Sequence, residues 1–458
     1  LTQTNNNYML MPQSGKEMTL IRRLPALSEN ALLRYITFSA LYFAQGIPNG
    51  VFWYALPAWM AANGKTPAEI GSFVAIVGLP WSFKIIAAPF MDRFTYLPMG
   101  RRKPWMLFGQ AGLVASFMLL AVIKSPLDHL PILMVAGFMS SLASIFQDIS
   151  TDSLAIDILP EDQQARANGL MWGSKTVGIS ATVAVTSWLI AHYSFMLAMN
   201  MFGIIISVVM LFPLILKERP GERLAPWTAG RTSPEAQKIQ LTSWKILLNS
   251  LYKAFILPVS LFMGIAVFVY RTAVGIVNAT LPVFTVQELG WTDVRYSHIF
   301  SITALVGGIL GMFVGGAMID VFGKIKMMVL YALALIALLL TMALLPQYWG
   351  NENFVIGFFM VYGVLDTFIT ISIFAVAMQL CWKRVAATQF TLYMAIANLG
   401  LSAGAWIMGE VKVYFNWQQL FLFCVVFVVV VLAIIPFVKF IRHKQQLVEL
   451  ENKAQEVG

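Results

Sequence analysis

The sequence predicts an all-α membrane protein with about twelve transmembrane helices, arranged as two pseudo-symmetric six-helix bundles. Of the 458 residues, 59% are hydrophobic and only 12% are charged, and the mean hydropathy is +0.73. A soluble protein of this length could not bury so much apolar surface. The apolar residues also fall into runs of roughly 20, the length that crosses a bilayer. Finally, motifs of the first half recur in the second.

The apolar runs set the expected helices. In the first half they cover about 33–62, 68–91, 104–123, 131–158, 165–191 and 195–216, and in the second half about 253–286, 294–319, 326–346, 354–380, 386–411 and 416–440. The predicted bundles are therefore 33–216 and 253–441, with terminal tails over 1–32 and 442–458. The polar segment 217–252, which is rich in Pro and Gly, is expected to be a hinge between the bundles.

The charge distribution predicts the orientation and excludes several functions. With both termini in the cytoplasm, the opposite side keeps only four of the 31 Lys and Arg residues, namely Lys65, Lys124, Arg295 and Lys412. Positive charge is retained on the cytoplasmic side, so both termini are expected there. The net charge of +9 follows from topology, so no nucleic-acid partner is expected. The expected surroundings are the lipid bilayer, with the protein as a monomer.

The scarce metal-binding and nucleophilic residues argue against an enzyme. The two cysteines, Cys381 and Cys424, and the four histidines are scattered along the chain, so neither a disulfide framework nor a metal site is expected. No cofactor is predicted, and there is no Walker-type loop for ATP. The first thirty or so residues are polar and lack an apolar core, so no cleavable signal peptide is expected. Both tails are expected to be solvated and partly unstructured.

Two loops repeat across the halves. Asp92 and Arg93 end one apolar run, and Arg101, Arg102 and Lys103 precede the next. Asp320 ends another apolar run 228 residues later, close to half the chain length, and Lys324 follows it. An acid at a helix C-terminus needs a cation or another helix N-terminus nearby. These residues are therefore predicted to form gating loops of a duplicated transporter, with Asp92, Arg93, Arg101, Arg102, Lys103 and Asp320 as the latch.

The layout and a set of motifs point to a family. Paired six-helix halves joined by a basic linker are the layout of the major facilitator fold, whose substrate site lies between the halves. The runs Gly78–Lys84, Ala88–Arg93 and Gly100–Trp105, with Gln147-Asp148-Ile149 and Asp152 downstream, resemble the AmpG-like permeases, a branch that includes acetyl-CoA transporters. The resemblance implies an inner-membrane permease that imports anhydro-muropeptides with protons. Helix seven, around Arg271, departs from the family pattern.

Charges inside the predicted spans are candidate functional residues, because an ionisable group there costs a few kcal/mol. At ~1.5 Å per residue, Asp148 and Lys175 lie roughly 15 Å deep and Lys84 roughly 12 Å deep. An Asp148–Lys175 contact is therefore possible, and Lys84 is nearest the level of Asp152. These charges either handle protons and anions or form salt bridges that only lock helices together.

The second half and the first helix supply further candidates. Arg271 is expected to bind a substrate anion through two parallel hydrogen bonds. Asp366 either carries a proton or is a static partner of Arg271. Gln45, Asn49, Tyr54 and Asn278 either bind sugar hydroxyls and amides or join helices. The expected proton carriers are thus Asp148, Asp152 or Asp366. The expected substrate-binding residues are Arg271, Lys175, Lys84, Gln45, Asn49, Tyr54 and Asn278.

These observations predict a proton-coupled secondary transporter that imports an anionic amphiphilic solute, with anhydro-muropeptide as the first expectation. Because helix seven departs from the family, a carboxylate siderophore or another anionic metabolite stays open. A drug or metabolite exporter of the same fold also stays open, since the charges do not encode direction. A membrane sensor would fold in the same way but would tolerate loss of the midplane charges.

Overall fold

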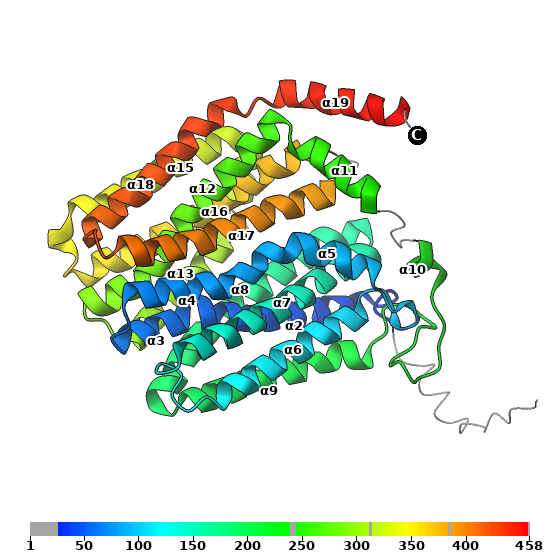
Figure 1. The fold of residues 1–458 in the computed structure, drawn as a ribbon, viewed down its shortest axis with the longest axis horizontal. Coiled ribbons are helices and arrows are strands. Elements are labelled where there is room, and N and C mark those ends of the chain that lie inside the picture. The colour runs from blue at the N-terminus through cyan, green and yellow to red at the C-terminus, as the bar shows by residue number, and fades with distance from the viewer. Residues whose placement is uncertain (1–25, 239–243, 311–313, 383–385, 457–458) are drawn as a thin grey trace, which may run out of the picture.

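The computed structural model describes residues 26–238, 244–310, 314–382 and 386–456, which form a bundle of long helices (Figure 1). Nine helices among the described residues are long and apolar enough to cross a membrane. Three further segments, α2 with α3, α8, and α13 with α14, pack lengthwise against them. This confirms the predicted all-α membrane fold.

The first half begins with a helix that changes pitch without ending. The elements of this half are α2 (Ala31–Gly50), η1 (Val51–Ala55), α3 (Leu56–Ala62), α4 (Pro67–Gly78), η2 (Leu79–Phe83), α5 (Lys84–Arg93), η3 (Leu97–Met99), α6 (Lys103–Ala121), α7 (Leu130–Ile158), α8 (Glu161–His192) and α9 (Phe195–Ile215). The segment η1 is a π-helix, and η2 is a 3₁₀-helix at the Pro80 position. Both irregular turns lie inside expected membrane helices.

The second half repeats the pattern after two short linker helices. Its elements are α10 (Pro234–Lys238), α11 (Trp244–Phe255), α12 (Pro258–Val283), η4 (Phe284–Glu288), α13 (Asp293–Leu310), α14 (Gly316–Phe322), α15 (Lys324–Leu344), η6 (Pro346–Tyr348), α16 (Glu352–Leu380), α17 (Ala386–Val411), α18 (Trp417–Ile434), η8 (Ile435–Phe437) and α19 (Phe440–Glu456). A π-helix, η4, follows α12 as η1 follows α2. The expected start of helix seven at 253 is wrong, because α11 ends at Phe255 and α12 begins only at Pro258. Proline is tolerated at the first position of a helix.

Each half is held together by helices whose backbones approach closely at glycine. In the first half, a Cβ on Gly178 of α8 would lie 2.4 Å from the Phe43 carbonyl oxygen on α2. In the second half, a Cβ on Gly404 of α17 would lie 2.1 Å from the Thr272 carbonyl oxygen on α12. Small residues allow such contact between membrane helices, where apolar side chains gain nothing by leaving lipid. The two halves thus share one packing device.

The halves meet along α4–α17 and α8–α13. A Cβ on Gly71 would lie 2.4 Å from the Ala405 carbonyl oxygen, and the hydroxyls of Ser187 and Ser297 are 2.5 Å apart.

Both termini of the described chain lie on one side of the bundle, here called the terminal face, and the loops around 63–66 and 289–292 form the opposite, far face (Figure 1). Gln287 closes the far face by donating to the Lys65 carbonyl oxygen at 2.7 Å.

The first part of the linker packs against the first half. This strap (residues 217–231) pairs with the chain before α2, where the Leu27 amide donates to the Lys217 carbonyl at 2.9 Å. The Glu218 carboxylate accepts the backbone amides of Arg101 at 3.0 Å, Arg102 at 2.7 Å, and Lys103. These amides are at the start of α6, so the carboxylate meets the positive end of the helix dipole. The linker expected to act as a hinge is thus anchored over its first fifteen or so residues.

The C-terminal tail expected to be partly unstructured forms helix α19 instead. His443 on α19 is buried and its Nε2 lies 2.7 Å from the Leu380 carbonyl oxygen at the end of α16. Leu447 and Leu450 pack against Ala254 and Trp382. The helix therefore lies across the terminal face of the second half. The apolar positions at helical spacing, rather than the overall polarity of the tail, decide its structure.

Candidate functional site

A charged cluster joins α2, α5 and α7 in the first half. The Lys84 ammonium group forms an ion pair with Asp148, and its Nζ is 3.7 Å from Oδ2 of Asp152. The Gln45 amide donates to Asp148 and the Tyr42 hydroxyl donates to Asp152. The side chains of Lys84 and Asp148 are 7% and 5% exposed, whereas that of Asp152 is 37% exposed. Lys84 therefore connects one buried and one accessible carboxylate.

Lys175 lies in a cage of aromatic rings rather than beside a carboxylate. Its Nζ is 5.3 Å from the ring centres of Trp81 and Trp172 and 6.0 Å from that of Tyr42. Among the described residues, Lys175 forms no ion pair, and Lys84 rather than Lys175 pairs with Asp148. Cation–π contacts give about 1 kcal/mol each, which together offset the roughly 3 kcal/mol cost of a cation in a membrane span. The cage can hold Lys175 charged without a counter-ion.

In the second half, Arg271 and Asp366 do not bind each other directly. The Arg271 guanidinium donates through Nη1 to the Thr370 hydroxyl at 3.4 Å, and its buried Nε finds no partner in the described part of the chain. Asp366 accepts from the Tyr270 hydroxyl at 2.8 Å and from Thr370 at 3.5 Å. Both charged side chains are partly exposed. Arg271 thus keeps most of its donors for another group, as expected of a residue that binds an anion.

The uncharged candidates take different positions. Tyr54 stacks on Phe300 of α13 with ring centres 4.0 Å apart, so it joins the two halves. Asn278 accepts from the Tyr362 hydroxyl at 3.2 Å within the second half. Asn49 is partly exposed, whereas Gln45 is fully buried against Asp148. Tyr54 therefore contributes to the contact between the halves, and Gln45 positions the carboxylate of Asp148.

The residues predicted to latch the terminal face are separated by the structure. The side chains of Asp92 and Asp320 lie outside the described part of the chain. Arg93 is exposed, whereas Arg101 and Arg102 are buried and bind Asp157, with Nη1 of Arg101 at 3.4 Å and Nε of Arg102 at 3.5 Å from Oδ2. Lys103 donates to the Leu216 carbonyl at 2.8 Å. The basic run therefore joins the loop after α5 to α7 and to the strap.

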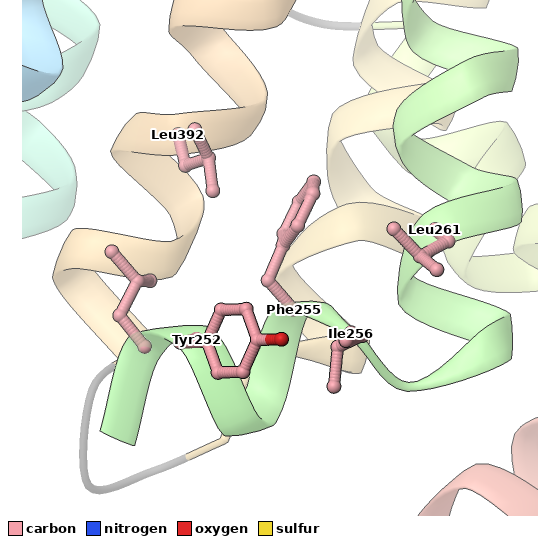
Figure 2. Close-up of a pocket in the computed structure, with 6 residues that line it drawn as sticks. Tyr252, Phe255, Ile256, Leu261 and Leu392 are labelled. Atoms are coloured by element: carbon pink, nitrogen blue, oxygen red, sulfur yellow. The ribbon is translucent and has the colours of Figure 1, made fainter. Parts of the chain in front are cut away.

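Two hollows among the described residues are lined by apolar side chains. One, of about 420 Å³, lies between the end of α11, α12 and α17; Figure 2 shows Tyr252, Phe255 and Ile256 with Leu261 and Leu392 around it. The other, of about 480 Å³, is lined by Phe83, Ile86, Ala87, Phe90 and Phe146. Neither offers a cation to a solute, and within the described residues no His, Cys, Asp and Glu cluster suits a metal ion. The polar layer at the midplane remains the candidate site.

Several residues of the site were not singled out from the sequence. Tyr42 and Trp172 each lie three residues before a candidate, Gln45 and Lys175, and so share its helix face. Trp81 is buried beside Lys175. Tyr270 precedes Arg271 directly, and no local pattern marks it as the partner of Asp366. Helical spacing was thus the available signal for Tyr42 and Trp172.

The fold and the site define a multi-pass membrane transporter with two six-helix halves. The chain belongs to the major facilitator superfamily, whose family model matches residues 38–405 and 263–457. A protein designated AmpG 4 in Rickettsia conorii is 24% identical over 419 residues, covering 87% of this chain and 94% of that protein. The anhydromuropeptide permease of Escherichia coli strain K12 is 21% identical over 396 residues, covering 84% of this chain and 75% of the permease.

Solved structures agree on the fold. A crystal structure of the nucleoside transporter NupG aligns with a TM-score of 0.67 at 15% identity, covering 90% of this chain and 98% of that chain. A POT family transporter in complex with a thioalcohol-conjugated peptide aligns with a TM-score of 0.65 at 13% identity, covering 89% and 96%. The family model thus makes the chain a transporter and not an enzyme, and the relatives named here are similar to it at 21–24% identity.

Proposed function

We propose that this transporter is a proton-coupled importer of an anionic amphiphilic solute, and that the solute is an anhydro-muropeptide. The observation that carries the proposal is Arg271, a mid-helix cation whose buried Nε has no partner, and whose guanidinium binds no carboxylate, among the described residues. A fixed cation in a membrane span is costly unless it has a function. Its free donors suit a carboxylate. The choice of anhydro-muropeptide as the solute follows from the relative named anhydromuropeptide permease.

The proposed cycle uses the contacts between the halves. Both termini are proposed to face the cytoplasm, because the far face carries so few basic residues. Gln287, Ser187 and Tyr54 join the halves from the far face to the midplane, so these contacts must break when the site opens outward. Arg271 from one half and Lys175 from the other would hold the solute, while Asp148, Asp152 or Asp366 carries the proton. The loops around Asp92 and Asp320, with Arg93 and the run Arg101–Lys103, would latch the cytoplasmic side.

The test is uptake into proteoliposomes with an imposed pH gradient. Labelled anhydro-muropeptide and an iron-loaded carboxylate siderophore are offered in parallel, with Arg271→Ala, Asp148→Asn and the matched control Arg295→Ala. Arg295 is half-exposed and paired with Glu352 at the far face, so its loss should leave uptake unchanged. Gradient-driven muropeptide uptake that only the first two variants lose supports the proposal.

Other outcomes point elsewhere. Siderophore uptake would agree with proton-coupled import but would contradict the choice of anhydro-muropeptide as the solute. Efflux instead of uptake would favour an exporter of the same fold. Loss of the midplane charges without any effect on cell physiology would favour a membrane sensor. Transport of neither solute would contradict the proposed substrates and leave the fold as the supported conclusion.

A further inference from the structure

The two carboxylates of the Lys84 cluster lie one helical turn apart on α7 but differ in their surroundings. Asp148 is buried, pairs with the Lys84 ammonium group and accepts from Gln45. Asp152 accepts from the Tyr42 hydroxyl, lies 3.7 Å from Lys84 and exposes 37% of its side chain. Only Asp152 of this pair can therefore be reached readily by water.

Protonation of the two groups has different consequences for Lys84. Neutralising Asp148 would leave a buried ammonium group without its close partner, which is a costly state. Neutralising Asp152 leaves the Lys84–Asp148 pair intact. A group that exchanges protons during a cycle must be accessible and must not leave a buried charge behind. Of these two carboxyls, Asp152 meets both conditions.

Tyr42 connects Asp152 to the aromatic cage of Lys175. Its hydroxyl binds the carboxylate, and its ring lies 6.0 Å from Lys175 Nζ and packs edge-on against Trp172 with centres 6.3 Å apart. The groups that surround Asp152 are Tyr42 from α2, Lys84 from α5, Asp148 on α7 and Lys175 from α8. When both acids are ionised, the charges of Lys84 and Lys175 balance those of Asp148 and Asp152. Protonation of Asp152 leaves one net positive charge beside the cage.

We propose, building on the function proposed above, that Asp152 carries the coupling proton and that its protonation turns the Lys175 cage into a binding site for the solute's carboxylate. Removing the negative charge of Asp152 strengthens the attraction of Lys175 for an anion. By linkage, a bound anion strengthens proton binding at Asp152 by the same factor. Proton and anion would thus enter the site together, and neither would gain by entering alone.

The first experiment compares two transport modes in proteoliposomes with labelled anhydro-muropeptide. Asp152→Asn should exchange muropeptide across the membrane but lose accumulation driven by a pH gradient, because asparagine mimics the protonated acid. In this variant, the muropeptide concentration that gives half the maximal exchange rate should no longer depend on pH. Asp148→Asn should lose both modes. Asp128→Asn, an exposed acid in the loop after α6, is the matched control and should keep both. Accumulation by Asp152→Asn would overturn the proposal.

A second measurement needs no solute. An infrared pH titration of the reconstituted protein should show a protonated-carboxyl band that is absent in Asp152→Asn and present in Asp128→Asn. A band that persists unchanged in Asp152→Asn would overturn the assignment. If the wild type moves no muropeptide while the band still maps to Asp152, the assignment of Asp152 as the proton carrier is retained and the proposed solute is rejected. The two failures can therefore be told apart.

Discussion

The two halves of the molecule share their packing but differ in how they treat charge. Gly178 and Gly404 bring helices together in equivalent places, and a π-helix follows the first helix of each half. The first half binds its carboxylates to a shared lysine, whereas the second ties Arg271 and Asp366 to neutral hydroxyls. The two halves therefore share the contacts that hold helices together, whereas their charged side chains are paired in different ways.

The largest expected effect tests the shared packing. Gly404→Val would place a side chain 2.1 Å from the Thr272 carbonyl oxygen, and a backbone atom cannot rotate away. We expect no folded, monodisperse protein on size exclusion in detergent, and the same for Gly178→Val. Gly357→Val on α16 is the control, because a Cβ there meets no atom within 4 Å. Normal yields of the first two variants would contradict the claim that both halves depend on close backbone contact.

The next effect tests the difference in charge pairing. Lys84→Met leaves Asp148 buried without its cation, which should lower the free energy of unfolding by about 3 kcal/mol. Arg271→Met removes no ion-pair partner from a described residue, so its effect should be below about 1 kcal/mol. Thermal unfolding midpoints in one detergent measure both. Equal losses in the two variants would mean that Arg271 has the same structural role as Lys84, and the comparison would fail.

A smaller effect sharpens the role of Arg271. Arg271→Lys keeps the charge but loses the forked pair of donors, so KM for anhydro-muropeptide should rise about tenfold, or about 1.4 kcal/mol. Arg295→Lys at the far face should leave KM unchanged. The measurement is initial uptake rate against solute concentration in proteoliposomes. A KM that stays at the wild-type value would show that the guanidinium geometry is not used.

The smallest effect concerns the strap, which packs against the first half. Burial raises the pKa of Glu222 from its ordinary 4.5 to about 7. The packed strap thus binds this proton more tightly than the released strap does. Its packing is strongest below about pH 4.5 and weakens as the pH rises to 7. Hydrogen exchange over 217–231, corrected for intrinsic rates, should be slower at pH 6 than at pH 8.

Glu222→Gln tests the cause of this pH dependence. The variant should reduce the difference in exchange between pH 6 and pH 8, because glutamine stays neutral at both. Glu218, whose pKa burial also raises, remains as a second source. An unchanged difference in the variant would assign the whole effect to Glu218.

The sequence determined the helices, their order, the duplication and the height of each charge in the membrane. Hydropathy is local and a bilayer fixes the span length, so apolar runs reveal the spans directly. Asp148, Lys175 and Lys84 were placed at the midplane for the same reason. The fold class and the family resemblance could be predicted from these features and from the motifs around Asp92 and Asp148.

Only the tertiary structure decided which groups meet. Depth gives the height of a residue but not the rotation of its helix, and so Lys84 rather than Lys175 binds Asp148. Three features join residues that are far apart in sequence: the aromatic cage, the Tyr42–Asp152 contact, and the binding of Glu218 by the amides at the start of α6. Helix α19 packs on distant apolar residues that its own polar composition does not reveal. Such contacts depend on the packing of whole helices, which no local pattern encodes.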